Sequence, residues 1–123
     1  MLRGVVVVFL AVLLTVLSHG AAFAHAHLKT SLPAAGATVA TGASEARLQF
    51  NEAVEPALSK ISVEVKGGKP VAAQPPVSDP ADKATLIVKF SQPLPAGSYE
   101  VNWQVVSADT HKVKGSFSFQ VRP

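Results

Sequence analysis

Hydrophobic and polar positions alternate along several short stretches of the chain, a pattern typical of β-strands that bury one face. The alternation is clearest over 99–105 and 117–121, where aromatic and aliphatic residues take every second position. Shorter strands with the same pattern are expected in five further places: 61–65, 86–90, 48–50, near 27–31 and near 70–73.

Turn-forming residues separate these stretches, and no segment shows the 3.6-residue period of a helix. The turns are expected at five places: 33–36, 67–68, 75–80, 93–97 and 110–115. About seven short strands in a single small domain predict an all-β fold, either a two-sheet sandwich or a small Greek-key barrel. Trp103 lies on an apolar strand face and is expected in the core.

Residues 1–24 have the three parts of an export signal. Arg3 supplies the positive charge, 5–17 is an apolar run, and Ala22-Phe23-Ala24 is the small-x-small pattern that precedes a cleavage site. The apolar run is shorter than the roughly 20 residues that span a bilayer, and no second such run follows. We expect cleavage after Ala24, leaving residues 25–123 as one soluble, monomeric domain.

Composition excludes several classes of function. The formal net charge is +3 over 123 residues, and one cation, Arg3, belongs to the expected signal, so the charge is too small to indicate a nucleic-acid partner. The chain has no cysteine, and its one methionine is Met1. The expected mature domain therefore has no disulfide, no thiol nucleophile and no soft metal ligand.

Cleavage after Ala24 would make His25 the first residue, so that a free amine and an imidazole on one residue could chelate a metal. Asp109 and His111 are two positions apart, and in an extended segment such residues point to the same side. With His25 they would form a set of three nitrogens and one oxygen. Such a set suits Cu(II), which favours tetragonal N/O coordination, whereas Zn(II) accepts similar ligands but prefers a tetrahedron.

Other interpretations of the same residues remain open. His27 would be third in the mature chain, so the terminal amine, two ionised backbone amides and its imidazole could form a square-planar Cu(II) or Ni(II) site. A strand beginning at His27 would oppose this and leave it at a strand edge. An Asp-x-His pair is also common in solvated loops. Ser107 precedes the pair, but adjacency in sequence does not make a catalytic triad.

These motifs together resemble the CopC-type periplasmic copper-binding proteins. The resemblance covers the whole expected mature chain, and the motifs that carry it are His25-Ala26-His27-Leu28, Ser31-Leu32-Pro33-Ala34-Ala35-Gly36, Leu48-Gln49-Phe50-Asn51-Glu52, Pro95-Ala96-Gly97-Ser98-Tyr99-Glu100-Val101-Asn102-Trp103, Val106-Ser107-Ala108-Asp109-Thr110-His111 and Gly115-Ser116-Phe117-Ser118-Phe119. It implies a Greek-key β-barrel with an immunoglobulin-like sandwich topology.

The resemblance also implies a high-affinity Cu(II) site whose ligands match His25, Asp109 and His111, with Glu52 matching an acidic residue near the site. It implies periplasmic copper capture, for tolerance or delivery, beside a CopD-like inner-membrane protein. Some members carry a methionine-rich loop for Cu(I), but 65–80 here has no methionine and no histidine. The chain therefore resembles the Cu(II)-only subgroup, with one Cu(II) per chain.

Two other functions fit parts of the pattern. An N-terminal histidine and a second histidine also form the copper brace of lytic polysaccharide monooxygenases. That oxidase needs an open coordination position, which Asp109 would fill, and a broad substrate face, for which this domain is small. A metal-free immunoglobulin-like interaction module is the other alternative. We expect a binding protein and not an enzyme.

Overall fold

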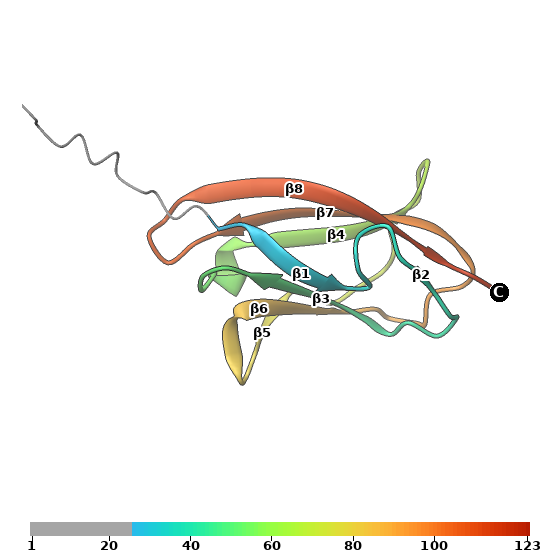
Figure 1. Cartoon of the computed structure of the whole chain (residues 1–123), viewed down its shortest axis with the longest axis horizontal. Helices are drawn as coiled ribbons and strands as arrows, with labels where there is room; N and C mark the ends of the chain where they lie inside the picture. The colour runs from blue at the N-terminus through green and yellow to red at the C-terminus, as the bar shows by residue number, and fades with distance from the viewer. Residues whose placement is uncertain (1–25) are drawn as a thin grey trace, which may run out of the picture.

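Two four-stranded sheets packed face to face make up the structure (Figure 1). The computed structural model describes residues 26–123, and residues 1–25 lie outside that part. The strands are β1 (Leu28–Leu32), β2 (Thr38–Val39), β3 (Glu45–Phe50), β4 (Lys60–Val65), β5 (Val77–Asp79), β6 (Asp82–Lys89), β7 (Gly97–Val106) and β8 (Lys112–Val121), with one 3₁₀ turn, η1 (Pro56–Leu58). The predicted all-β fold is confirmed. No helix within 26–123 is long and apolar enough to cross a membrane.

The sheets have the strand orders β1-β3-β6-β5 and β2-β8-β7-β4. Because β1 and β3 lie in one sheet while β2 and β4 lie in the other, the chain crosses between sheets repeatedly, as in other β-sandwiches. The longest pairing joins β7 and β8 as an antiparallel hairpin, in register from Gly97↔Val121 to Val106↔Lys112. β2 pairs with β8 in parallel over two residues.

Most of the predicted strands are present, but three details of the prediction are wrong. The expected strand near 70–73 is only two isolated bridges, Glu64↔Pro70 and Ala73↔Phe90, in a stretch that begins with a proline lacking an N–H. The short strands β2 and β5 were not expected. The turn expected at 110–115 is shorter, because β8 already begins at Lys112.

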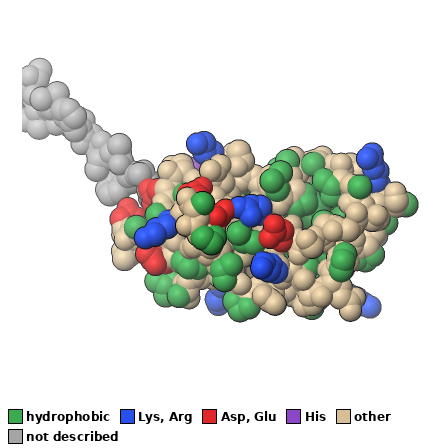
Figure 2. Space-filling view, turned by 90° about the horizontal axis from the view of Figure 1, so that it is seen from below, with side chains coloured by type: hydrophobic (Ala, Val, Ile, Leu, Met, Phe, Trp, Pro, Cys, Tyr) green, Lys and Arg blue, Asp and Glu red, His purple; other side chains and the backbone are tan. Residues whose placement is uncertain are grey.

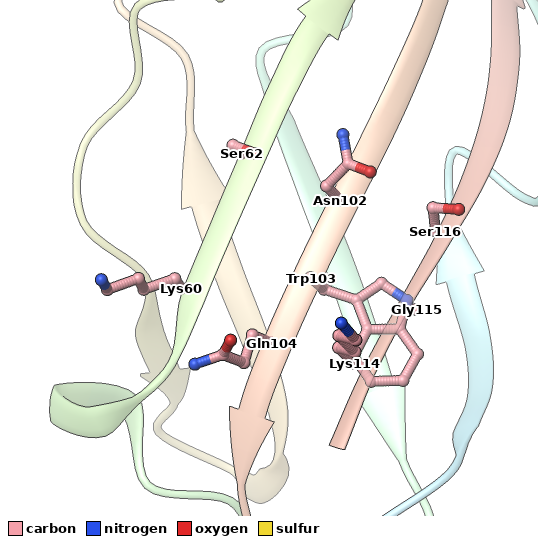
Figure 3. Close-up of a pocket in the computed structure, with 8 residues that line it drawn as sticks. All are labelled: Lys60, Ser62, Asn102, Trp103, Gln104, Lys114, Gly115 and Ser116. Atoms are coloured by element: carbon pink, nitrogen blue, oxygen red, sulfur yellow. The ribbon is translucent and has the colours of Figure 1, made fainter. Parts of the chain in front are cut away.

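The core lies between the sheets, on the inward-facing alternate residues of the long strands. Trp103 is buried, as expected, with 8% of its surface exposed, and its ring meets that of Phe50 edge-on at 5.2 Å. Gly115 pairs with Trp103 across the hairpin, and the indole reaches over it (Figure 3). A Cβ at position 115 would lie 2.4 Å from the indole Cζ2, so this strand position accommodates only glycine.

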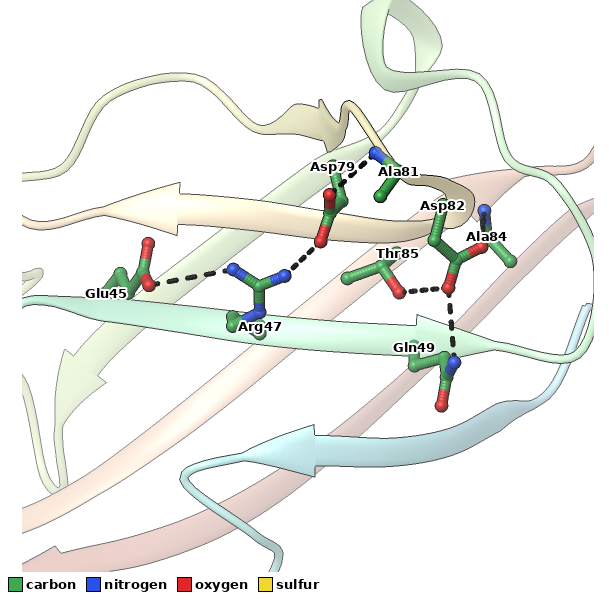
Figure 4. A network of polar contacts seen from close by, with 8 residues as sticks. All are labelled: Glu45, Arg47, Gln49, Asp79, Ala81, Asp82, Ala84 and Thr85. Atoms are coloured by element: carbon green, nitrogen blue, oxygen red, sulfur yellow. Dashed lines mark hydrogen bonds and ion pairs between the residues drawn. The ribbon is translucent and has the colours of Figure 1, made fainter.

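A polar network covers the outer face of the β1-β3-β6-β5 sheet (Figure 4). Arg47 on β3 pairs with Asp79 on the edge strand β5. Asp82, at the start of β6, accepts hydrogen bonds from Thr85 at 2.8 Å and from Gln49 at 3.2 Å. These bonds, above all the one from Thr85, lower the pKa of the Asp82 carboxyl. The network joins β3 to β6 and to the short edge strand.

One end of the sandwich gathers the segments that carry the candidate chemistry. β7 ends at Val106 and β8 begins at Lys112, while β1 begins opposite the end of β3 in the pair Leu28↔Phe50. Figure 1 shows the β7–β8 turn and the start of β1 at this end, and the C-terminus at the other.

Candidate metal centre

The turn between β7 and β8 is closed by its own backbone. The Ser107 N–H donates to the His111 carbonyl oxygen at 3.0 Å, and the Thr110 N–H donates to the Ser107 carbonyl oxygen at 2.9 Å. Thr110 has φ of 70°, in the left-handed region that few non-glycine residues adopt. The chain therefore reverses sharply just before His111, and the segment is a turn, not the extended backbone that the sequence suggested.

The side chains of Asp109 and His111 nevertheless meet. Oδ2 of Asp109 lies 2.9 Å from Nδ1 of His111, and the two side chains are 49% and 44% exposed. The Ser107 hydroxyl donates to the other carboxylate oxygen, Oδ1. The hydrogen bond from Ser107, followed by that from His111, lowers the pKa of the Asp109 carboxyl. An ionised carboxylate only accepts hydrogen bonds, so Nδ1 of His111 is the donor.

Ser107 has a role here that the sequence did not reveal. It is fully buried, with 0% of its surface exposed, and its hydroxyl holds Asp109 instead of the His111 ring. The three residues are therefore not arranged as a nucleophilic triad, in which the serine would contact the histidine ring. The S-x-D-x-H spacing was the available signal, but it gave no direction for the hydroxyl.

The loop 51–55 links this turn to the start of the described chain. The Ala108 N–H donates to the Ala53 carbonyl oxygen at 3.3 Å. On its other side, Asn51 exchanges two hydrogen bonds with His27: its N–H donates to the His27 carbonyl oxygen at 3.0 Å, and its Oδ1 accepts from the His27 N–H at 2.6 Å. The start of β1 and the Asp109–His111 pair are thus anchored to one short loop.

The predicted site residues are only partly within the described chain. His25 and the predicted cleavage after Ala24 lie outside residues 26–123. The His27 side chain is exposed, and Glu52 is half-buried in the loop 51–55. Within 26–123, no three His, Cys, Asp or Glu side chains come together in a way that could hold a metal ion. What this part of the chain brings together is the pair Asp109 and His111.

A hollow lies elsewhere, on the outer face of the β4–β7–β8 strands. It has a volume of about 510 Å³, and Figure 3 shows its lining: Lys60, Ser62, Asn102, Trp103, Gln104, Lys114, Gly115 and Ser116. The lining includes no histidine and no carboxylate, so its donors do not suit a transition metal.

Charge is unevenly spread over the face seen in Figure 2. Lys and Arg side chains are scattered singly, whereas Asp and Glu side chains gather toward the end that carries the β7–β8 turn in Figure 1. A concentration of carboxylates at this end favours the approach of a cation.

A family model described as the CopC domain matches residues 28–122, nearly all of the described chain. The chain belongs to the CopC family. The Copper resistance protein C of Xanthomonas campestris pv. juglandis is 39% identical over 112 residues, which cover 86% of this chain and 87% of that protein.

Solved structures show the same sandwich. PcoC, a methionine-rich copper resistance protein from Escherichia coli, matches with a TM-score of 0.72 and 36% identity, over 80% of this chain and 100% of that one. CopC from Methylosinus trichosporium OB3b matches with a TM-score of 0.74 and 33% identity, over 80% and 95% of the two chains. These findings confirm both the suspected family and the fold. The chain differs from PcoC in having a single methionine, Met1.

Proposed function

We propose that this protein binds one Cu(II) ion in the periplasm and captures copper for tolerance or for delivery to an inner-membrane transporter. The ion is held by the amine and imidazole of His25 together with Asp109 and His111. The observation that carries the proposal is the Asp109–His111 pair, held by Ser107 at the end of the sandwich where the described residues begin. The family of copper resistance proteins supports copper as the ion.

The donor chemistry favours Cu(II) over the other states and metals considered. Imidazole and amine nitrogens with one carboxylate form the tetragonal N/O set that Cu(II) prefers. Since the only sulfur in the chain is that of Met1, which the proposed cleavage would remove, no soft ligand remains for Cu(I). The protein therefore belongs functionally with the Cu(II)-only members.

Export and processing complete the proposal. Cleavage after Ala24 gives the amine of His25, and residues 25–123 act as a soluble monomer without nucleic acid. A CopD-like inner-membrane protein is the proposed recipient or source of the copper. With Asp109 as a ligand, the ion has no open equatorial position for oxygen chemistry, so the protein acts as a carrier and not as an oxidase.

The decisive experiment compares chains that differ only at the amine. Exported protein is first weighed by mass spectrometry to identify its first residue. Cu(II) competition titrations then compare protein starting at His25 with protein carrying two glycines before His25. The extension should weaken binding by at least about tenfold, because it displaces the amine and removes a chelate ring.

Three results would contradict the proposal. Equal affinity of the two forms would exclude the amine as a donor. Absence of Cu(II) binding by the processed form would favour the metal-free interaction module. Ascorbate-driven peroxide formation with cleavage of a polysaccharide by the loaded protein would favour the oxidase.

A further inference from the structure

The side chain of Asn51 completes a strand pair that the backbone alone leaves unfinished. In an antiparallel pair, two opposed residues each donate an N–H to the carbonyl oxygen of the other. Beyond the pair Leu28↔Phe50, the Asn51 N–H donates to the His27 oxygen at 3.0 Å in the ordinary way. The His27 N–H, however, donates to Oδ1 of Asn51, at 2.6 Å. A side-chain amide oxygen thus takes the place of a backbone oxygen.

This bond bears on how a chain beginning at His25 holds a metal. A terminal tripeptide with histidine third can wrap a metal with its amine, two backbone amide nitrogens and the imidazole, a square-planar set suited to Cu(II) and Ni(II). An amide nitrogen that binds a metal no longer carries its hydrogen. The His27 N–H···Oδ1 bond and a bond from the same nitrogen to a metal therefore exclude each other.

Ala26 adds a second, independent restraint. Its side chain is 0% exposed and belongs to the hydrophobic core. Wrapping a metal in one plane would require the backbone from 25 to 27 to turn around the ion. Ala26 would then leave the core, and its apolar surface would return to water.

We infer that Asn51 is a positioning residue that determines metal specificity: it denies the His27 amide to metals and so reserves His25 for the donor set with Asp109 and His111. The inference rests on the proposed function, since it presumes the free amine at His25. Its consequence is discrimination against Ni(II), which favours the planar wrap.

The test uses protein starting at His25, titrated with Ni(II) alone and with Cu(II) alone at one neutral pH. Asn51→Ala removes the acceptor oxygen, whereas Asn51→Asp keeps an oxygen at the same position. Gln49→Ala, which removes a side-chain amide on β3 that contacts Thr30 and Asp82, is the matched control. A synthetic peptide of residues 25–30 gives the absorption and paramagnetic resonance spectra of the planar wrap.

Asn51→Ala should bind Ni(II) at least about tenfold more tightly than the unsubstituted protein, the size of effect typical of an outer partner. Its Ni(II) and Cu(II) spectra should shift toward those of the peptide. Asn51→Asp and Gln49→Ala should behave as the unsubstituted protein does. Adding His27→Ala to Asn51→Ala should abolish the gain. Unchanged Ni(II) affinity and spectra in folded Asn51→Ala would overturn the inference.

A measurement without substitution guards against misfolding of the variant. In the metal-free protein, the His27 amide hydrogen should exchange with solvent at least about tenfold more slowly than in the peptide, because it is hydrogen-bonded. Exchange as fast as in the peptide would overturn the inference.

The outcomes separate this inference from the proposed donor set. If His111→Ala weakens Cu(II) binding but Asn51→Ala leaves Ni(II) binding unchanged, only the role of Asn51 fails. If Asn51→Ala binds Ni(II) more tightly and with the spectrum of the planar wrap, but His111→Ala leaves Cu(II) affinity unchanged, only the donor set fails. A planar-wrap spectrum from the unsubstituted protein would overturn both.

Discussion

The carboxylate of Asp109 and the imidazole of His111 are in contact in the metal-free chain, with Oδ2 and Nδ1 2.9 Å apart. Two proposed ligands from opposite sides of a left-handed residue, Thr110, are therefore already adjacent before any ion arrives. Because Nδ1 and Oδ2 are hydrogen-bonded to each other, this bond must break before both side chains can bind one ion. The contribution of each proposed ligand to metal binding can be measured by substitution, because changes at exposed turn residues disturb the core little.

Replacing His111 by alanine should weaken Cu(II) binding by more than about 100-fold, beyond the loss typical of an outer partner. His27→Ala should cost no more than about tenfold, because its side chain is not a proposed ligand. Asp109→Asn should weaken Cu(II) binding by an amount between these two losses, since an amide oxygen can still occupy the ligand position. Competition titration with paramagnetic resonance on each variant checks the order. Loss of tight binding in His27→Ala with an unchanged His111→Ala would refute the assignment.

Ser107→Ala should raise the pKa of the Asp109 carboxyl, because the lost hydrogen bond is the main cause of its lowered value. Cu(II) affinity should fall by about tenfold, as the carboxylate loses the group that orients it. Carbon NMR of the Asp109 carboxyl against pH measures the first effect and competition titration the second. Ser116→Ala, at an exposed position of β8, is the control and should change neither. An unchanged pKa of the Asp109 carboxyl in Ser107→Ala would contradict the hydrogen bond between Ser107 and Asp109.

Acid should release the copper through the nitrogen donors first. The lowered pKa of Asp109 keeps this carboxylate ionised as the pH falls, whereas a free imidazole takes up a proton near about 6.5 and a free amine near about 8. Protons compete with the metal for these nitrogens, so release should occur between neutral pH and roughly 4–5 and involve more than one proton. Affinity measured at a series of pH values gives the proton number. A constant affinity from pH 8 to 5 would exclude amine and imidazole ligation.

Reduction should weaken retention of the metal. Residues 25–123 contain no methionine and no cysteine, so Cu(I) lacks the soft ligands that it prefers. Competition with a Cu(I) chelator under anaerobic conditions measures this, with the Cu(II) titration of the same sample as reference. Tight binding of one Cu(I) per chain would show the Cu(II)-only assignment to be wrong.

Gly115→Ala should destabilise the fold by about 1–3 kcal/mol, the usual cost of overpacking a core. The new Cβ would meet the indole of Trp103 at 2.4 Å, and this ring also packs edge-on against Phe50 in the core. Urea unfolding followed by Trp103 fluorescence measures the change. Gly68→Ala, where a Cβ would meet nothing within 4 Å, should be close to neutral. Equal stability of the two variants would mean that the ring moves aside freely.

The strands β7 and β8 could be predicted from the sequence because burial alternates along most of their length, as it does over 98–105 in β7. The strands β2 and β5 could not, because two or three residues are too few to show a period. Gly115 suggested a turn, since a glycine in a strand cannot be distinguished from one in a loop until its partner, Trp103, is known.

The candidate site, like the fold, could be predicted from the sequence only in part. The spacing of Asp109 and His111 indicated that the two side chains could face one metal, but it did not reveal the turn at Thr110 through which they come into contact. The contributions of Ser107 and Asn51 depend on where single hydrogen bonds go, and no local pattern encodes that. The partner of the His27 amide lies 24 residues away, and it follows only from the register of β1 against β3.

The hairpin that carries the Asp109–His111 turn also determines through which end the protein should be attached to a surface for a binding measurement. β7 alone has 10 residues, which at about 3.3 Å per residue extend for about 30 Å. The chain ends at Pro123, beyond the far end of β8, at the opposite end of the sandwich from the turn (Figure 1). A tag or linker fused to Pro123 would therefore anchor the protein to a sensor surface with its proposed copper end outermost, whereas attachment through the amine would bury the end to be measured.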